Sequence, residues 1–381
     1  MALTLIMIDL FSVRKKYKVY IPSELIADKY VGVIYGYHHE NTGVFNITGI
    51  NSVNGEEIIG NITSDKVNNT TDGLVGYWED GRLCFTYQDE EYDIAEYTLE
   101  KNLFSRNTGI LETDWMMDKC AFMLGCGSVG SLVALELARA GVGTFVLIDN
   151  DIVEYHNLCR HQCGVHEVGS FKVDAMKKRI LDINPHATVV TCTNIVEEVP
   201  KEIYDKYAGK NTIFVGCADN READVYGNRI SMMYGSAYLS AGFWERAFAG
   251  EIFYHLPEQH MPCYKCALGS GESLSERTTQ SRRIYTTEEN LERINFEPGI
   301  AVDIDFVTII ATKLAIDILN RFNEKYIPKL LPSLKQFTLV CNTNDTRIGG
   351  NMAEIFSYPL QITRNLKVDF QEGECPPCKC L

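Results

Sequence analysis

The chain has 381 residues, of which 45% are hydrophobic, and its formal net charge is −15. This length is typical of two domains, and the apolar content is sufficient for a sizeable core. The negative charge argues against nucleic acid and anionic membranes as partners, because both would repel it.

The sequence indicates neither a targeting signal nor a membrane span. Residues 1–11 are apolar, but they contain Asp9 and lack both a basic start and a small-residue cleavage site. No apolar run reaches the length of about 18 residues that a membrane helix needs. We therefore expect a cytoplasmic protein, in which paired cysteines more often bind metal than form disulfides.

Residues 1–100 predict a small β-rich (α+β) accessory domain. Runs of β-branched and aromatic residues at 19–21, 31–37 and 74–78 are separated by Asn-Gly, Asp-Gly and Asn-Asn turns. We interpret this domain as non-catalytic and expect it to recognise a substrate or partner.

A glycine-rich turn then connects two apolar runs. The run at 121–124 precedes Gly125, Gly127 and Gly130, and a helical stretch and a second apolar run lead to Asp149. This order predicts a β-α-β unit whose glycines let the backbone approach a phosphate at a helix N-terminus. Asp149 is then placed to bond a ribose hydroxyl. The fold class predicted here is α/β, Rossmann-like, with a mainly parallel sheet, although a lone glycine pattern also fits a generic dinucleotide fold.

Polar residues follow directly after Asp149. Asn157, Arg160 and Lys172 suit a site that holds three phosphates and stabilises a departing pyrophosphate, whereas a nicotinamide enzyme has no use for them there. Another apolar run, at 212–215, leads to Asp219 at a strand end, where open α/β sheets bind ligands. A carboxylate that faces phosphates at this place is suited to hold Mg²⁺.

In order and spacing, these motifs resemble the ThiF/HesA superfamily, the ubiquitin-activating-enzyme fold, over an adenylation domain at 101–381. Members use Mg-ATP to adenylate the C-terminal glycine of a small ubiquitin-like protein. The residues that the resemblance implies for nucleotide binding are Gly125, Gly127, Gly130, Asp149, Asn157, Arg160 and Lys172. Those implied to be catalytic are Asp219, Arg160, Lys172 and Arg106, with Asp219 as the magnesium-associated carboxylate.

Arg106 lies in a segment, residues 103–111, that resembles the family's stretch before the nucleotide strand. In dimeric members an arginine there reaches the partner's ATP, so the resemblance implies a homodimer. The alternative is an ordinary surface arginine. The chain departs from the family at His161, where some relatives have Gln. We leave His161 out of the site, as either a substitution within it or a bystander.

Two CxxC pairs, Cys263/Cys266 and Cys375/Cys378, predict a metal site. Each pair closes a tight turn that aims two thiolates at one point, and two such turns complete a closed tetrahedral site, which is structural. Members of the resembled family carry this zinc. The alternative is unpaired cysteines, including a redox CxxC. Cys380, beyond the second pair, is either a spare thiol or a ligand in place of one of these four cysteines.

Between the two CxxC pairs, residues 267–297 are expected to form the family's crossover loop. Relatives that form a thioester generally carry its cysteine there, and residues 267–296 contain none, so adenylation is well supported and a thioester step is not. Residues 300–322 have helical apolar spacing. The stretches at 337–340 and 361–363 look like closing strands.

We therefore predict an ATP-dependent adenylyltransferase that activates the C-terminal carboxylate of a ubiquitin-like protein, with ATP, Mg²⁺ and structural Zn²⁺. One alternative is a peptide-adenylating enzyme of ribosomal natural-product maturation, whose N-terminal domain binds the leader. Another is a non-catalytic scaffold of the same fold. The presence of Arg106, Asn157, Arg160, Lys172 and Asp219 argues against the scaffold.

Overall fold

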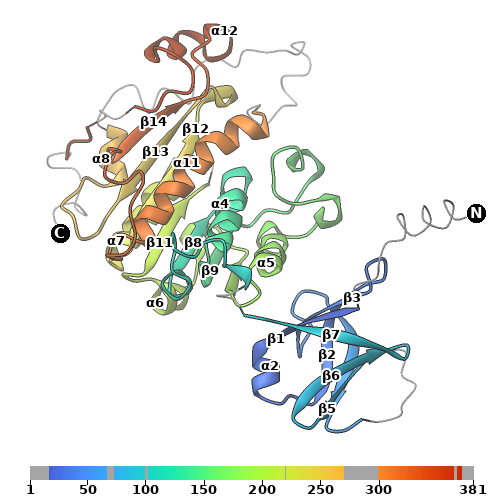
Figure 1. The fold of residues 1–381 in the computed structure, drawn as a ribbon. Coiled ribbons are helices and arrows are strands. Elements are labelled where there is room, and N and C mark those ends of the chain that lie inside the picture. The colour runs from blue at the N-terminus through green and yellow to red at the C-terminus, as the bar shows by residue number, and fades with distance from the viewer. Residues whose placement is uncertain are drawn as a thin grey trace, which may run out of the picture. The chain divides into compact units, whose positions relative to one another are not determined.

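The computed structural model describes residues 17–66, 73–98, 102–218, 220–269, 299–363 and 367–370. The chain divides into two compact units between Arg106 and Asn107 (Figure 1). Asp219, Cys375, Cys378 and Cys380 lie outside the described residues, as does the expected crossover loop from residue 270 onward. Among the helices that are described, none is both long and apolar enough to cross a bilayer.

The first unit is a closed barrel of seven strands with the order β1-β3-β2-β4-β5-β6-β7. Its strands are β1 (Lys18–Pro22), β2 (Gly32–His39), β3 (Val44–Gly49), β4 (Glu57–Thr63), β5 (Leu74–Glu79), β6 (Arg82–Tyr87) and β7 (Glu90–Tyr97), and the short helix α2 (Ser23–Ala27) follows β1. The barrel closes because β1 pairs in parallel with both β3 and β7. Alternate side chains such as Val19, Ile21, Phe45 and Ile47 fill its interior. This agrees with the predicted β-rich domain and adds the closure.

The second unit contains a seven-stranded sheet with the order β10-β9-β8-β11-β12-β13-β14. Its strands are β8 (Cys120–Leu124), β9 (Thr144–Ile148), β10 (Thr188–Cys192), β11 (Thr212–Gly216), β12 (Ala237–Phe243), β13 (Ala249–His255) and β14 (Phe337–Cys341). Strands β8 to β12 are parallel, and β13 and β14 pair in the antiparallel sense. The predicted α/β fold with a mainly parallel sheet is confirmed.

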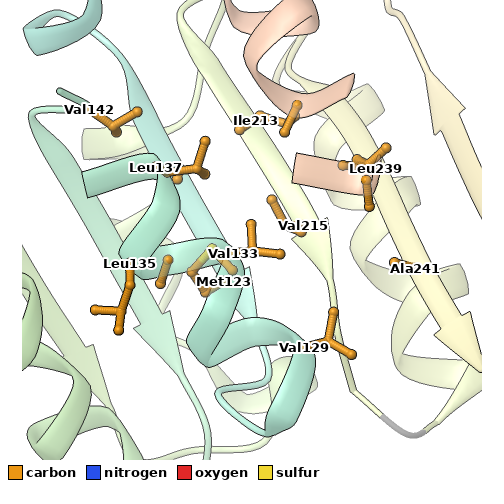
Figure 2. Packing of buried hydrophobic residues seen from close by; sticks show 14 of the residues in the cluster. Met123, Val129, Val133, Leu135, Leu137, Val142, Ile213, Val215, Leu239 and Ala241 are labelled. Carbon is orange, nitrogen blue, oxygen red and sulfur yellow. The ribbon is translucent and has the colours of Figure 1, made fainter. Parts of the chain in front are cut away.

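Helices cover both faces of this sheet. The helices described in this unit are α3 (Thr113–Met117), α4 (Ser128–Arg139), α5 (Lys172–Ile183), α6 (Lys201–Tyr207), α7 (Arg221–Met233), α8 (Tyr264–Gly269), α11 (Ala301–Leu319) and α12 (Thr346–Gly349). Met123 of β8 packs with α4, α5 and α11 on one face, and Phe122 packs with α6, α7 and α8 on the other. This alternation explains why the strand is apolar throughout. Figure 2 shows the first cluster around Met123, Val133 and Leu137.

Helix α11 confirms the helical spacing predicted at 300–322. Leu314, Ala315 and Ile318 are fully buried, and the helix packs against α4 and β12 (Figure 1). Helix α8 extends to Gly269, past the expected start of the crossover loop at residue 267. The predicted closing strand at 337–340 is β14, and Val340 forms an isolated bridge with Ile362.

Candidate nucleotide-binding site

The strand order places two loops at the same edge of the sheet. The chain runs from β8 outward to β9 and β10, and then returns to the other side of β8 to form β11. Open α/β sheets bind ligands at the carboxyl ends of strands where the order reverses in this way. The Cys217 N–H donates to the Leu124 carbonyl at 2.9 Å, so the loops that leave β8 and β11 are in contact at this edge.

Three glycines shape the loop between β8 and α4. Gly125 has φ +105°, which L side chains rarely adopt, and a Cβ on Gly130 would lie 2.0 Å from the Gly125 carbonyl oxygen. A Cβ on Gly127 would meet nothing within 4 Å. Among the described residues, no side-chain hydrogen bond caps the start of α4 at Gly127. Its first amides are therefore open to an anion, and Gly127 leaves room for one, so this cradle fits the phosphates of ATP.

The carboxylate of Asp149 joins the glycine loop to the turn after β9. Its Oδ2 accepts the Cys126 N–H at 2.7 Å, and its Oδ1 accepts the Asp151 N–H at 2.8 Å. Each oxygen has a further lone pair for a ribose hydroxyl. Asp149, the residue expected to bind the ribose, therefore lies against the glycine loop that is expected to bind phosphate.

Lys172 lies at the first position of α5 and is held next to the same turn. The Ile152–Phe171 bridge brings the two segments together, and the Lys172 N–H donates to the Asp151 carbonyl at 2.9 Å. The ammonium Nζ lies 2.6 Å from Asp151 Oδ2, and the Lys172 side chain is only 11% exposed. A largely buried lysine thus accompanies Asp149 at the loop.

Asn157 and Arg160 belong to a turn that follows, which contains η2 (Tyr155–Asn157). Asn157 Oδ1 accepts the Glu154 N–H at 2.9 Å, so this side chain stabilises the turn itself. The Arg160 N–H donates to the Asn157 carbonyl at 3.0 Å, and Arg160 is half-buried. Their contacts with phosphate remain predictions.

The described structure does not test two other expected site residues. Arg106 is exposed at the end of the first unit, and its reach to a partner's nucleotide remains a prediction. Asp219 is outside the described residues. Its neighbour Asn220 caps α7, because its Oδ1 accepts the Glu222 N–H at 2.9 Å. Among the described residues no group of three or more metal-ligating side chains gathers.

Sequence reasoning missed a polar cluster beside α7. A groove of about 550 Å³ is lined by Arg221, Tyr226 and Arg229 of α7 and by Lys265 of α8. Glu251 of β13 holds Arg221 in place: its Oε1 lies 3.1 Å from Arg221 Nη2, and its Oε2 accepts Trp244 Nε1–H at 3.1 Å. The spacing of these residues along the chain gave no signal, because β13 and α7 are brought together only by the sheet.

Asp224 and Tyr238 form a buried pair in the same region. The Tyr238 hydroxyl donates to Asp224 Oδ1 at 2.9 Å, and Asp224 is 8% exposed. Burial is the main cause that raises the pKa of Asp224 to about 7; the Tyr238 hydrogen bond opposes the shift, and the nearby Glu251 contributes to it. The pair packs against Gly216, where a Cβ would lie 2.2 Å from Asp224 Oδ1.

The first cysteine pair is buried at α8. Cys263 and Cys266 are 1% and 0% exposed, and their sulfurs are 3.9 Å apart. A disulfide needs about 2.05 Å. Val368 packs against the cluster formed by Met232, Cys263 and Cys266, and the Phe370 ring stacks on His260 with centroids 4.5 Å apart. The described part of the tail thus reaches the first pair shortly before the second pair begins.

A family model matches the sequence of the second unit. The ThiF family model covers residues 109–348, which is more than half of the chain. The chain belongs to the ThiF family. This confirms the resemblance drawn from the motifs and makes the protein a member of the ThiF-like adenylyltransferases.

Individual relatives share a modest sequence identity with this chain. The ubiquitin-like modifier-activating enzyme 5 of Caenorhabditis briggsae is 27% identical over 208 residues, 50% of this chain and 48% of its own. The adenylyltransferase and sulfurtransferase uba4 of Aspergillus clavatus is 32% identical over 154 residues, 38% of this chain and 30% of its own. The chain thus spans about half, or less, of these relatives. The structure of E. coli MccB with ATP shares the fold, with a TM-score of 0.50, 19% identity and coverage of 73% and 74%.

The glycine loop gives a paired prediction. Gly130→Ala should destabilise the protein by about 1–3 kcal/mol, because the new methyl group has no space against the Gly125 carbonyl. Gly127→Ala has open space around the new methyl group, so its free energy of unfolding should lie within about 0.5 kcal/mol of the wild-type value. It should nevertheless bind ATP more weakly. Denaturant unfolding and ATP titration of both variants measure this. Equal ATP affinity in folded Gly127→Ala and wild type would show that phosphate does not approach this loop.

Asp224 gives a prediction about pH. Its folded pKa of about 7 lies above the ordinary value of 3.8, so between these values the folded state binds more protons and stability falls as pH rises. Asp224→Asn keeps an acceptor for Tyr238 and cannot ionise. Its stability relative to wild type should therefore increase by about 2–4 kcal/mol from pH 4 to pH 8. Denaturant unfolding of both proteins across this range tests it, and a constant difference would contradict the buried neutral carboxyl.

Proposed function

We propose that this protein is an ATP-dependent adenylyltransferase that activates the C-terminal carboxylate of a ubiquitin-like protein as an acyl-adenylate. The observation that carries the proposal is the cluster around Asp149. It joins the open N-terminus of α4 to a turn that holds Lys172, at the edge where the strand order reverses. These are the parts needed to hold a nucleotide by its ribose and its phosphates.

The reaction forms one bond and breaks another. A carboxylate oxygen of the substrate bonds to the α-phosphorus of ATP, and the α-phosphorus separates from the oxygen that leaves with pyrophosphate. The first amides of α4 bind phosphate, Asp149 orients the ribose, and Lys172 and Arg160 stabilise negative charge on the leaving group. No side chain needs to act as a nucleophile, so the rate depends on positioning and charge.

Two further groups belong to the proposal. Mg²⁺ would be held by Asp219 and would neutralise phosphate charge. Arg106 would act across a homodimer interface on the partner's nucleotide. Both follow from the family's chemistry, and the described residues do not test either.

The substrate class is supported by the relatives. Several curated matches are named ubiquitin-like modifier-activating enzymes, which favours a ubiquitin-like protein. A peptide substrate is the second candidate, favoured by the fold that the chain shares with MccB over most of both chains. In this case the barrel would bind the leader, whereas with a ubiquitin-like substrate it would contact the folded carrier or another partner.

A structural zinc site also forms part of the proposal. Two thiolates bound to tetrahedral zinc at about 2.3 Å are about 3.8 Å apart, and the Cys263 and Cys266 sulfurs are 3.9 Å apart. The contacts of Val368 and Phe370 support the approach of the second pair, Cys375 and Cys378. Four thiolates leave no open position, so this metal would stabilise the fold and take no part in the chemistry.

The exchange of pyrophosphate into ATP tests the activity. Wild type with its substrate should catalyse it, and Asp219→Ala should lower the rate by at least ~10²-fold, the scale of removing one preorganised charge-stabilising group. Asp114→Ala, an exposed carboxylate on α3 before β8, is the control and should keep the rate. Ubiquitin-like proteins and short peptides are offered separately, so the same assay identifies the substrate class. Undiminished exchange in Asp219→Ala would remove the role assigned to that residue.

The same assay tests the shared site. Arg106→Ala should also be inactive alone, but a mixed dimer of Arg106→Ala and Asp219→Ala chains should regain part of the exchange, because one of its two sites has both residues. Failure of the mixture to recover activity would place Arg106 within its own chain's site or outside the reaction.

Elemental analysis tests the zinc. Wild type purified without chelator should contain about one zinc per chain. Cys375→Ser should lose it and melt at a lower temperature, because structural zinc contributes directly to folding. Cys380→Ser is the matched control in the same tail and should keep the metal. Wild-type protein free of zinc would refute the site. Loss of zinc in Cys380→Ser would show that Cys380 is a ligand in place of one of the four proposed cysteines.

A further inference from the structure

His161 is buried between two backbone groups of the site. It is 7% exposed, its Nε2 lies 2.6 Å from the Cys126 carbonyl oxygen, and its Nδ1 accepts the Cys163 N–H at 3.1 Å. The backbone N–H of His161 donates to the Asn157 carbonyl at 2.8 Å. The side chain therefore connects the centre of the glycine loop to the turn that carries Asn157 and Arg160.

These two contacts fix the protonation state of the ring. A carbonyl oxygen only accepts, so Nε2 carries the proton, and a backbone N–H only donates, so Nδ1 must have its lone pair free. Only the neutral Nε2–H tautomer satisfies both. A protonated ring would direct Nδ1–H at the Cys163 N–H and lose that bond.

The Cys126 residue is held from both sides as a result. Its N–H donates to Asp149 at 2.7 Å, and its carbonyl accepts from His161. Cys126 directly precedes Gly127, the residue before the open first turn of α4. The orientation of this peptide decides where the phosphate-binding amides point.

We propose that neutral His161 is a positioning residue for the nucleotide loop, which fixes the Cys126 carbonyl and ties the loop to the Asn157–Arg160 turn. This rests on the proposed function, because it assumes that the loop binds ATP. His161 itself does not need to touch the nucleotide. His161, which was left out of the site on sequence grounds as either a substitution within it or a bystander, is thus part of the frame of the site.

We call the two hydrogen bonds of the His161 ring, to the Cys126 carbonyl and from the Cys163 N–H, the clamp. The clamp has a consequence at acid pH. The charged and titratable groups that face His161 are Lys172 of α5, Asp149 after β9 and Glu167 of η3 (Val165–Glu167). Burial and Lys172 lower the pKa of His161 below 6.5, while the Cys126 carbonyl, Asp149 and Glu167 oppose this shift. The ring is therefore neutral at pH 7, and the clamp weakens only as pH falls through this lowered pKa.

Two substitutions separate the contacts. An amide nitrogen in His161→Gln lies near the place of Nε2 and can donate to the Cys126 carbonyl, whereas His161→Asn places its oxygen near Nδ1 and keeps only the Cys163 contact. Neither side chain titrates in the acid range. His166→Asn, which removes an exposed histidine in the same segment, is the control. The measurement is the Kd for ATP by calorimetric titration at pH 7.5, 6.0 and 5.0.

At pH 7.5 His161→Asn should raise the Kd at least ~5-fold, the scale of losing one buried hydrogen bond, and His161→Gln should recover most of the loss. As pH falls through the lowered pKa of His161, wild type and His166→Asn should lose more affinity than His161→Gln. Wild-type affinity in His161→Asn at pH 7.5 would overturn the proposal.

Hydrogen exchange of the nucleotide-free protein separates this proposal from the proposed function. Amides of residues 127–131 should exchange faster in His161→Asn than in wild type, whatever the loop binds. If wild type binds no ATP, the proposed function fails, and faster exchange still supports the clamp. Unchanged exchange in His161→Asn would refute the clamp even in a protein that binds ATP.

Discussion

The two hydrogen bonds to the Asp149 carboxylate are the interaction on which the site depends. They join the Cys126 and Asp151 amides, which belong to different loops, through one charged acceptor. Bonds to a charged group are stronger than neutral ones, so this connection is stiff for its size. Lys172 is tied to Asp151, and His161 is tied to Cys126, so both side chains keep their places through this carboxylate.

The sheet provides the frame for this connection. Strands β8 and β9 pair in register from Cys120–Thr144 to Leu124–Ile148, so both end at the same level. The Gly125 N–H then donates to the Ile148 carbonyl at 2.9 Å, directly before Asp149. Both strands are buried between layers of helices, and packing of this density allows little adjustment. The positions of the loop and the carboxylate are therefore set by the core.

Much of this could be predicted from local sequence. The β-α-β unit follows from apolar runs around Gly125 and Gly130, and the structure shows why each glycine is required: a positive φ at the first and a close backbone approach at the second. His161 could not be assigned in this way, because its partners Cys126 and Cys163 meet only after folding. The barrel closure likewise depends on the pairing of β1 with β7, which is distant in the chain and has no local signal.

The most direct test of the account is a calorimetric titration of Mg-ATP into wild type and Asp149→Asn. The amide oxygen of the variant can accept one backbone N–H, but the amide nitrogen cannot accept the other. One of the two hydrogen bonds that join the Cys126 and Asp151 amides is therefore lost. We expect wild type to bind ATP and Asp149→Asn to bind it at least ~10-fold more weakly, with circular dichroism showing the helices intact. Equal affinity in the two folded proteins would contradict the claim that this carboxylate organises the nucleotide site.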